Sequence, residues 1–558
     1  MYEHDVLVVG AGLAGMRATL AAHQKGANVA MITKVHPVRS HSNAAQGGIN
    51  AALTSRGDSW EDHAQATVKG SDYLGDQDAI EVMCQEAGDA IIELEHMGVI
   101  FNRDETGHLG TRRFGGQEVA RTFFVADITG AAILQVLYEQ VLKAQVRVYE
   151  EWFVTSLVMA DGECRGVVAL ELMTGQLHLI KAKAVVLCTG GTGRIYEPTT
   201  NGLVVTGDGL ALAYRVGAPL LDMEMVQYHP TTLKGNGVLI TEAARGEGAY
   251  LLNAKGERFM EKYAPKLMEL ASRDVVSRAE QTEINEGRGV DGCVLLDLRH
   301  LGKEVIETKL GYINEVAMDF LGINLAEEPI PVRPGHHYQM GGIKTNVLGA
   351  TSIPGLYAAG ECAGVSVHGA NRLGANSLLD TLIFGRRSGE AATAHAKEQS
   401  PKEVPESVLE ADGALIRSFL ERKPKGDSWA RVRLEMGETM NQYMAVFRNE
   451  EGMKAALNKV CELKERYPRL AVQDKGQVFN TNLLFTLELG FMLDIAETIC
   501  VSGLARKESR GAHYRGDIPR RDDVNWLKHT VVSWTPEGTQ MDFAPVTITR
   551  WQPQERRY

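Results

Sequence analysis

The sequence lacks long apolar runs, clustered cysteines and an excess of positive charge, and each absence excludes a class of protein. No run reaches the roughly 18 apolar residues that a membrane-spanning helix needs. The seven cysteines lie far apart without a C-x-x-C pair, which argues against structural zinc or an iron–sulfur cluster and suits a reducing compartment. The net charge of −12 disfavours nucleic acid as a partner, although local positive charge can still bind an anionic substrate.

The sequence also shows no leader, repeat or low-complexity segment. The apolar strand-like run begins within a few residues of the start, so we expect neither a signal peptide nor a transit peptide. With 558 residues, 44% of them hydrophobic, the chain is long enough for three or four globular domains.

A dinucleotide-binding fingerprint opens the chain. Residues 6–9 are a continuous apolar run, read as a buried parallel strand, and they lead into Gly10, Gly12 and Gly15 at the G-x-G-x-x-G spacing. A helix over residues 16–24 and a second strand over residues 28–33 complete the unit. The glycines allow a tight turn, close approach of a pyrophosphate and packing of helix on strand. Where an acidic ribose ligand is expected, the chain has Thr33 and Lys34 instead.

The stretch RSHSNAAQGG, residues 39–48, follows the fingerprint. His41 stands between small polar residues, and the pair Gly47 and Gly48 fits a backbone that lies flat against a planar ligand. A histidine in such a setting is usually a solvated loop residue. Its place directly after the fingerprint favours a cofactor contact.

Three later segments predict further cofactor contacts. Residues 183–191 form a buried strand that ends at Thr189, Gly190 and a second glycine. In the loop of residues 206–209, Asp208 could either cap a helix or hold a ribose hydroxyl. A short strand over residues 354–361 ends at Glu361, an acid that could bind the ribitol or ribose. The nucleotide-binding domain is therefore predicted to be discontinuous.

Candidate substrate ligands occur in five short segments. Each has an ordinary interpretation as a surface ion pair, a helix cap or a core histidine. Together they supply two imidazoles, two or three guanidinium groups and a hydroxyl, which is the set that binding a dianion requires. The residues are His229, Thr241, Glu242, Arg245, Arg273, His337 and Arg372.

Seven ordered blocks make the chain resemble the flavoprotein subunits of succinate dehydrogenase and quinol-linked fumarate reductase. They are RSHSNAAQGG, QYHPT, TEAARGEG, SRDVVSRA, HHYQMGG, GANRLGANSLLD and, at residues 508–530, ESRGAHYRGDIPRRDDVNWLKHT. The resemblance implies FAD attached covalently to His41 through the flavin 8α-methyl group. It implies noncovalent FAD contacts from Gly10, Gly12, Gly15, Thr33, Lys34, Ser40, Gln46, Gly47, Gly48, Thr189, Gly190, Asp208, Glu361, Ser377 and Leu378.

The resemblance also assigns roles in catalysis. Oxidising a saturated dicarboxylate removes a hydride and a proton from adjacent carbons, so a base must face the flavin across the substrate. One carboxylate is expected to meet His337 and Arg372, and the other His229 and Thr241. Arg273 is the expected proton-transfer residue, with Glu242 and Arg245 as a relay behind it. An arginine normally keeps its proton, so Arg273 as a further clamp, with water as base, stays open.

The predicted fold is α/β, in four parts. A discontinuous Rossmann-like FAD-binding domain takes residues 1–228 and 345–400, and an α+β capping domain of residues 229–344 is inserted into it. A helical domain follows at 401–515, beginning with a linker at 401–405, and a tail domain takes 516–558. The tail block with Arg510, His513, Arg515 and residues 520–523 could be a solvated charged face.

The resemblance predicts oxidation of succinate to fumarate, with electrons passing to an iron–sulfur subunit and, through membrane anchor subunits, to quinone. The alternatives are a physiological quinol:fumarate reductase and, less favoured, L-aspartate oxidase, which lacks the attachment histidine. Gln46 favours the dehydrogenase, because fumarate reductases tend to have Glu there. We expect no metal site in this chain and a peripheral location on the cytoplasmic face of a prokaryotic inner membrane.

Overall fold

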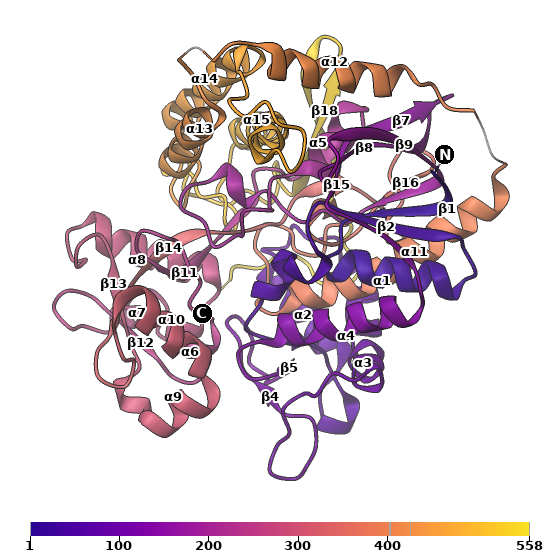
Figure 1. Ribbon diagram of the computed structural model, residues 1–558. Helices are drawn as coiled ribbons and strands as arrows, with labels where there is room; N and C mark the ends of the chain where they lie inside the picture. The colour runs from indigo at the N-terminus through magenta and orange to yellow at the C-terminus, as the bar shows by residue number, and fades with distance from the viewer. Residues whose placement is uncertain (1, 401–402, 425, 557–558) are drawn as a thin grey trace.

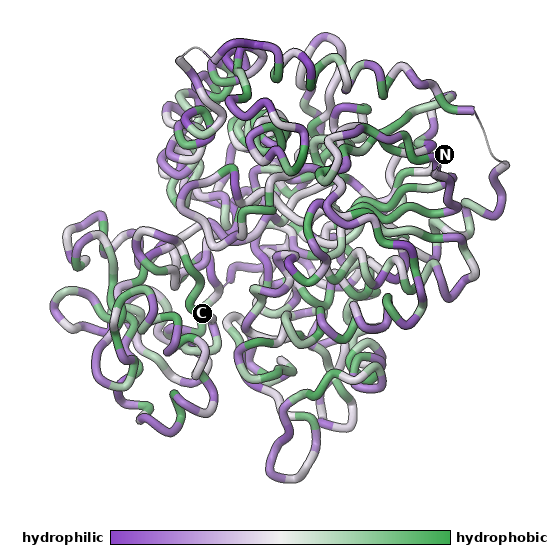
Figure 2. Tube along the Cα trace, viewed as in Figure 1, coloured by the Kyte–Doolittle hydropathy of each residue, from purple (hydrophilic) through white to green (hydrophobic). Residues whose placement is uncertain are grey.

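A parallel sheet forms the centre of the molecule. The computed structural model describes residues 2–400, 403–424 and 426–556. Strand β1 (Tyr2–Val9) lies between β2 (Val29–Thr33) and β9 (Gln176–Leu187), and β6 (Arg147–Glu150) and β16 (Leu356–Ala358) extend the parallel part. Figure 2 shows these strands as apolar segments. The carboxyl half of β1 is buried on both faces, which is why its sequence is continuously apolar.

Helix packing covers one face of this sheet. Helix α1 (Leu13–Gln24) packs along α11 (Asn376–Glu398), with α4 (Thr129–Lys143) beside α1 (Figure 1). Gly10 has φ +110°, and a Cβ there would lie 2.1 Å from the Cys188 carbonyl oxygen. Only glycine fits this strand-to-helix turn. The predicted strand–helix–strand unit is therefore confirmed, with α1 beginning three residues earlier than expected.

An antiparallel ribbon and a group of helices extend this domain. Strands β7 (Trp152–Ala160) and β8 (Glu163–Glu171) join β9 as an antiparallel meander, as predicted for residues 146–180. Helix α2 (Trp60–Gly70) packs against α3 (Gln77–Met97), which also contacts α11. A small sheet of β3 (Ile49–Asn50), β4 (Thr111–Arg112) and β5 (Thr122–Phe123) follows the His41 segment.

A second unit, which we call the capping region, comprises residues 226–339. Its antiparallel sheet has the order β11 (Val226–Leu233), β14 (Ile330–Gln339), β13 (Val294–Asp297), β12 (Tyr250–Leu252). The helices around this sheet are α6 (Ala243–Gly246), α7 (Met260–Tyr263), α8 (Arg273–Asn285), α9 (Lys303–Lys309) and α10 (Gly311–Leu321). The region has an apolar core of its own and stands apart from the parallel sheet in Figure 1. The residue limits of the predicted domains stay a prediction.

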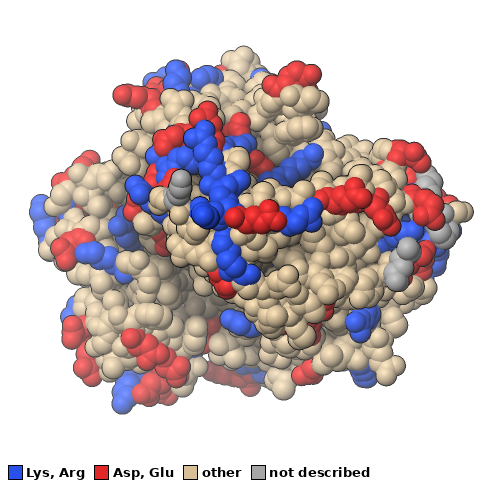
Figure 3. Space-filling view, turned by 45° about the horizontal axis from the view of Figure 1, so that its top comes forward, with Lys and Arg blue, Asp and Glu red and all other residues tan. Residues whose placement is uncertain are grey.

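The helical part after residue 400 packs on the meander side. It consists of α12 (Ser407–Glu421), α13 (Trp429–Tyr443), α14 (Glu450–Arg466) and α15 (Thr481–Ala505). Leu484, Leu487, Phe491 and Ile495 form an apolar stripe at helical spacing on α15, and all four are buried in the core. Acidic and basic side chains alternate over the face that these helices present (Figure 3). Among the described residues, no helix is long and apolar enough to cross a membrane. The first two residues of the predicted linker at 401–405 lie outside the described part.

The tail completes a five-stranded sheet. Strand β19 (Gly538–Pro545) pairs with β18 (Lys528–Thr535), and β18 pairs with β10 (Leu220–Leu221). Strand β10 pairs with β15 (Gly342–Lys344), and β17 (Ala363–Gly364) lies at the other edge.

The interpretation of the tail block as a solvated face is wrong for Arg510, His513 and Arg515, whereas residues 520–523 are exposed or half-buried. Arg510, His513 and Arg515 are at most 1% exposed. The buried arginines find carboxylates: Arg510 Nε donates to Glu508 at 2.8 Å, and Arg515 is paired with Asp517. Buried charges are tolerated when each contacts an opposite charge, and Arg510 and Arg515 both have such a contact.

Candidate active site

One cavity of about 330 Å³ lies between the parallel sheet, the capping region and the first turn of α11. It is lined by every predicted cofactor and catalytic residue except Gly15, which packs α1 against β1, and Arg245, which lies one layer further out. Segments from residue 9 to residue 381 thus meet at one site. The individual roles of these residues stay predictions.

The fingerprint glycines and Lys34 form one end of the cavity. A Cβ on Gly12 would lie 3.2 Å from the Ser42 hydroxyl oxygen, so a side chain there would fill the space beside the helix N-terminus. Lys34 Nζ lies 2.7 Å from Asp208 Oδ2 and 2.6 Å from Glu488 Oε1 of α15. Asp208 begins α5 (Asp208–Arg215) without making a side-chain cap, so the capping interpretation is not supported.

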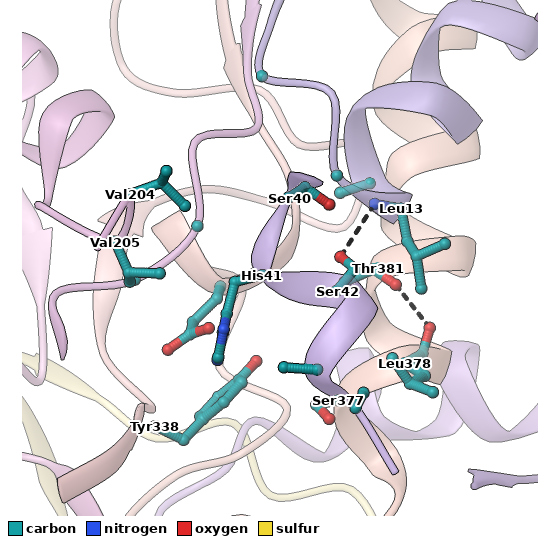
Figure 4. A pocket seen from close by; sticks show the side chains of 18 of the residues that line it. Leu13, Ser40, His41, Ser42, Val204, Val205, Tyr338, Ser377, Leu378 and Thr381 are labelled. Carbon is teal, nitrogen blue, oxygen red and sulfur yellow. Dashed lines mark hydrogen bonds between the residues drawn. The ribbon is translucent and has the colours of Figure 1, made fainter. Parts of the chain in front are cut away.

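His41 projects into the middle of the cavity from a 3₁₀ turn over His41–Ala44 (Figure 4). The Gly202 amide donates to His41 Nδ1 at 3.3 Å. Burial lowers the pKa of the imidazole to about 4. The ring is therefore neutral at pH 7, with Nδ1 as acceptor and the proton on Nε2. In the same turn the Leu13 amide donates to the Ser42 hydroxyl at 3.2 Å, which ties the His41 segment to the start of α1.

Glu361 and the start of α11 form the opposite wall. The Gln339 amide donates to Glu361 Oε1 at 3.0 Å, and burial raises the pKa of this carboxyl to about 7. Ser377 and Leu378 lie in the first turn of α11, where helix amides and the positive end of the dipole face the cavity.

Unpaired buried atoms show that the cavity is built for a polar, planar ligand. The Ser40 hydroxyl and Gln46 Oε1 are buried without a hydrogen-bond partner, a costly arrangement unless a ligand supplies one. A Cβ on Gly48 would lie 2.5 Å from the Phe123 carbonyl oxygen, and one on Gly47 would lie 2.4 Å from the Phe114 ring. These backbone positions, the glycine fingerprint and the α1 N-terminus fit FAD.

Two imidazoles face each other at the capping side of the cavity. The ring centroids of His229, on β11, and His337, on β14, are 4.9 Å apart in an edge-on arrangement. The Thr231 amide donates to His229 Nδ1 at 3.2 Å, and the Thr200 hydroxyl lies 2.9 Å from His337 Nδ1. Burial lowers both pKa values well below 6.5, assisted at His229 by the neighbouring arginines and at His337 by the His229 ring and then by the arginines. At pH 7 each ring is neutral, and His229 has Nε2–H free to donate.

Arg372 supplies positive charge to the same space. Its guanidinium lies over the Tyr338 ring, with 4.5 Å between Cζ and the centroid. Its Nε is buried without a partner. Burial, and then the charge of Arg273, lower the pKa to about 9, so the group stays charged at pH 7. We expect a buried cation with an unpaired donor to bind an anion.

Arg273 is the first residue of α8. Its Nε donates to Glu242 Oε2 at 2.6 Å and its Nη1 donates to Gln227 Oε1 at 3.0 Å. Glu242 is 1% exposed, and although burial opposes it, the charges of Arg273 and Arg245 lower its pKa. Glu242 Oε2 lies 3.7 Å from Arg245 Nη2. The carboxylate thus lies between two guanidinium groups, one in the cavity wall and one behind it.

Sequence reasoning missed two positioning residues. Gln227 holds Arg273 and also donates from Nε2 to the Arg372 carbonyl oxygen at 2.7 Å, so it fixes both arginines. Tyr338 is the platform under Arg372. Gln227 lies two residues before His229 in QYHPT, and Tyr338 directly follows His337 in HHYQMGG. This proximity to a predicted histidine was the available signal.

Comparison with known proteins identifies relatives over the whole length. A family model described as an FAD binding domain matches residues 5–378, and one described as the C-terminal part of the fumarate reductase flavoprotein matches 433–558. A succinate dehydrogenase flavoprotein subunit of Rickettsia conorii is 49% identical, over 98% of this chain and 96% of the relative. A fumarate reductase flavoprotein subunit of Mycobacterium tuberculosis is 45% identical, over 100% and 99%.

Solved structures agree with these sequences. A variant of the E. coli quinol fumarate reductase chain FrdA superposes with a TM-score of 0.95 at 42% identity, covering 99% of this chain and 98% of that one. Mycobacterium smegmatis Sdh1, in complex with UQ1, superposes with a TM-score of 0.88 at 34% identity, covering 99% and 96%.

Proposed function

The chain belongs to the family of succinate dehydrogenase and quinol fumarate reductase flavoprotein subunits, and from this premise we propose that it oxidises succinate to fumarate. The observation that carries the proposal is the meeting of His229, His337, Arg372 and Arg273 in the cavity that the dinucleotide fingerprint also lines. Two neutral imidazoles and two guanidinium groups match the two carboxylates of a C4 dicarboxylate.

The clamp would hold the substrate by both ends. Arg372 and His337 would bind one carboxylate. His229 would bind the other with Thr241, whose hydroxyl oxygen accepts the Ala243 amide at 3.2 Å and keeps its own proton to donate. Charge-assisted hydrogen bonds of this kind are stronger than neutral ones. Fixing both ends presents adjacent substrate carbons in one orientation.

Arg273 would exchange the proton. Bound FAD supplies a two-electron acceptor for the hydride. Arg273, held by Glu242 and Gln227, would first pass a proton to the Glu242 carboxylate and then, as a neutral guanidine, take the proton from the adjacent carbon; Arg245 lies behind Glu242 to carry the released proton away. Fumarate reduction would run the same steps backwards.

We further propose that FAD is attached to His41. The neutral ring with Nδ1 occupied by the Gly202 amide leaves Nε2 as the atom to bond the flavin 8α-carbon. Gln46 lines the cavity beside it and favours the dehydrogenase direction.

The electrons would leave through partner subunits. An iron–sulfur protein would drain the reduced flavin, and membrane anchor subunits would pass the electrons to quinone. The chain would then be peripheral, on the cytoplasmic face of a prokaryotic inner membrane.

The test uses the native complex. Succinate-dependent reduction of a quinone analogue, inhibited by malonate, would support the activity. Acid denaturation followed by peptide mapping would locate the flavin, and flavin on the peptide that contains His41 would support the covalent bond. A complex that retains FAD yet neither oxidises succinate nor reduces fumarate would contradict the proposal. Flavin released by acid from an active complex would contradict only the attachment.

A further inference from the structure

Glu280 is a buried carboxyl group without a partner. It lies on α8, is 0% exposed, and neither carboxylate oxygen has a hydrogen-bond partner among the described residues. The other buried acids of this helix are paired: Asp274 with Arg278 at 3.1 Å and Glu283 with Arg288 at 2.7 Å. Burying an unpaired carboxyl group lowers stability. Glu280 therefore calls for an explanation other than packing.

Glu280 lies on the same side of α8 as Arg273. The two are seven residues apart, which is almost two whole helical turns. On the facing segment, Glu242 precedes α6 and Arg245 lies within it, three residues further on. Arg273 meets Glu242, Glu242 meets Arg245, and Arg245 is the cation whose charge acts on Glu280. Basic and acidic groups thus alternate along one path. It runs from Arg273 in the cavity wall, through Glu242 and Arg245, to Glu280 in the interior of the capping region.

Arg245 has unused donors for this acid. Its Nη1 donates to the Glu269 carbonyl oxygen at 2.6 Å, but its Nε and Nη2 are buried without a hydrogen-bond partner. Two free donors and two free acceptors therefore occupy one buried region. A side-chain rotation or a bridging water molecule would satisfy both groups together.

We propose that Glu280 is the inner proton store of the relay that serves Arg273. This inference rests on the proposed function and adds a fourth group to its proton path. In fumarate reduction Arg273 first gives a proton to the substrate carbon and is left neutral. Arg245 then gives a proton to the Glu242 carboxylate, which passes it on to Arg273. The O–H bond of Glu280 breaks last, and its proton restores the charge of Arg245. Both electrons arrive with the hydride on the adjacent carbon. Glu280 ends as a carboxylate that must regain a proton before the next turnover, and the other three groups are back in their starting states.

The surroundings of Glu280 suit this role. Burial raises the pKa of its carboxyl group well above the usual range, while Arg245 opposes the rise. The acid therefore holds its proton at neutral pH, and Arg245 stabilises the carboxylate after the proton leaves. Cys293, beside β13, also interacts with Glu280. Arg333 of β14 and Lys234, after β11, act on Cys293.

Two substitutions test the proposal in the assembled complex. Glu280→Gln keeps the shape but cannot release a proton, and Glu280→Met replaces the buried polar group with an apolar one. We expect both to lower the rate of fumarate reduction about tenfold, a modest share of the 10²–10⁴ attributed to general acid–base groups. We expect a larger solvent deuterium isotope effect in both, and Glu280→Met should also unfold at a higher temperature than the wild type. A slower but more stable enzyme would separate proton supply from structural damage.

An infrared readout does not depend on turnover. A protonated buried carboxyl group gives a C=O band that shifts in D₂O, and we expect this band to vanish in Glu280→Gln. The matched control is Ser277→Ala, one turn earlier on α8, whose hydroxyl donates to the Tyr228 carbonyl oxygen at 3.1 Å. It should keep the wild-type rate, isotope effect and band. Wild-type rates and isotope effects in both Glu280 variants, or an unchanged band, would overturn the inference. An inactive wild-type complex would instead overturn the proposed function, and the band would still decide whether Glu280 holds a proton.

Discussion

Arg556 Nη2 lies 2.6 Å from Asp274 Oδ2, on the residue directly after Arg273. The same guanidinium reaches Asp72 Oδ1 at 3.1 Å through Nε. Asp72 lies between α2 and α3, and Asp274 lies in the first turn of α8. The tail of the chain therefore bridges the capping region and the domain of the parallel sheet, close to Arg273, the proposed proton-transfer residue.

Replacing Arg556 with Gln should loosen this bridge without unfolding the protein. Asp274 keeps Arg278 and Asp72 keeps Arg521, so neither carboxylate becomes unpaired. We expect the KM for succinate to rise about tenfold, equivalent to roughly 1.4 kcal/mol. Steady-state kinetics would measure the change. Arg550→Gln, on the same tail but paired with Glu81 at the surface, is the control, and an equal effect in both variants would contradict a specific bridge.

Arg372 should be needed as a planar, charged clamp. Its free Nε and its position over Tyr338 favour a two-point contact that lysine cannot make. Loss of one preorganised donor typically costs about 10²–10³ in rate, so Arg372→Lys should lower kcat/KM for succinate by that factor while FAD stays bound. Arg333→Gln, on the strand that carries Tyr338 but outside the cavity lining, is the comparison. An Arg372→Lys enzyme within a few-fold of wild type would refute the clamp.

His529 predicts a pH dependence of stability. Burial would lower its pKa, but Asp222 at 2.6 Å from Nδ1 and Asp76 at 3.3 Å from Nε2 outweigh burial and raise it to about 10. The folded state thus holds a proton that the unfolded chain releases near pH 6.5. The stabilisation is complete below pH 6.5 and falls away as the pH rises to about 10.

We expect His529→Gln to lower the unfolding temperature at pH 6 and to flatten its decline toward pH 10. Breaking a buried ion pair costs about 3–5 kcal/mol. Thermal unfolding followed by circular dichroism across this range would measure both effects. His96→Gln, an exposed position on α3, should leave the profile unchanged. A variant with the wild-type slope would show that another group causes the dependence.

Replacing Lys34 should lower the free energy of unfolding, and a second substitution should restore part of that loss. Lys34→Met leaves Asp208 and Glu488 as buried carboxylates without their cation, at a cost of about 3–5 kcal/mol. Adding Glu488→Gln removes one of the two charges and should restore part of the loss. Urea unfolding of the single and double variants would show the coupling. Strictly additive losses would contradict a direct interaction.

His41→Ser should leave FAD bound but untethered. Alkylation at the 8α position raises the flavin potential, and about 30 mV in a two-electron couple is worth roughly 1.4 kcal/mol. Losing the bond should therefore slow succinate oxidation more than fumarate reduction. Both rates would be compared with those of the wild-type complex prepared from the same host. Equal losses in the two directions would argue against a redox role for the bond.

Local patterns made part of this structure predictable. The turn at Gly10 depends on residues within a short span, so the strand, the glycines and α1 could be predicted together. The chemistry of His229, Arg273 and Arg372 was also readable, because each stands in a distinctive short motif. Their convergence depends on β11, α8 and the segment before α11, which are far apart in the chain. That convergence was predicted through the family resemblance.

The burial of Arg510 and the burial of Glu280 were not predicted, and both omissions have one physical cause. Arg510 looked like a surface residue because charge is usually solvated, and its partners Glu508 and Asp523 make burial possible only once the tail has folded back. Glu280 gave no signal, since a single acid in a polar helix normally faces water. Such burial depends on tertiary partners that no local pattern specifies.

The contact between Lys34 and Glu488 also has a consequence for the order in which the protein can be made. The fingerprint leaves the ribosome early, but the wall of the cavity beside Lys34 needs α15, which is synthesised several hundred residues later. The cavity is therefore still incomplete in a nascent chain that contains the glycine turn but not yet α15. The complete FAD site exists only after α15 has been translated. We therefore expect FAD to bind late in the synthesis of each molecule, or after it.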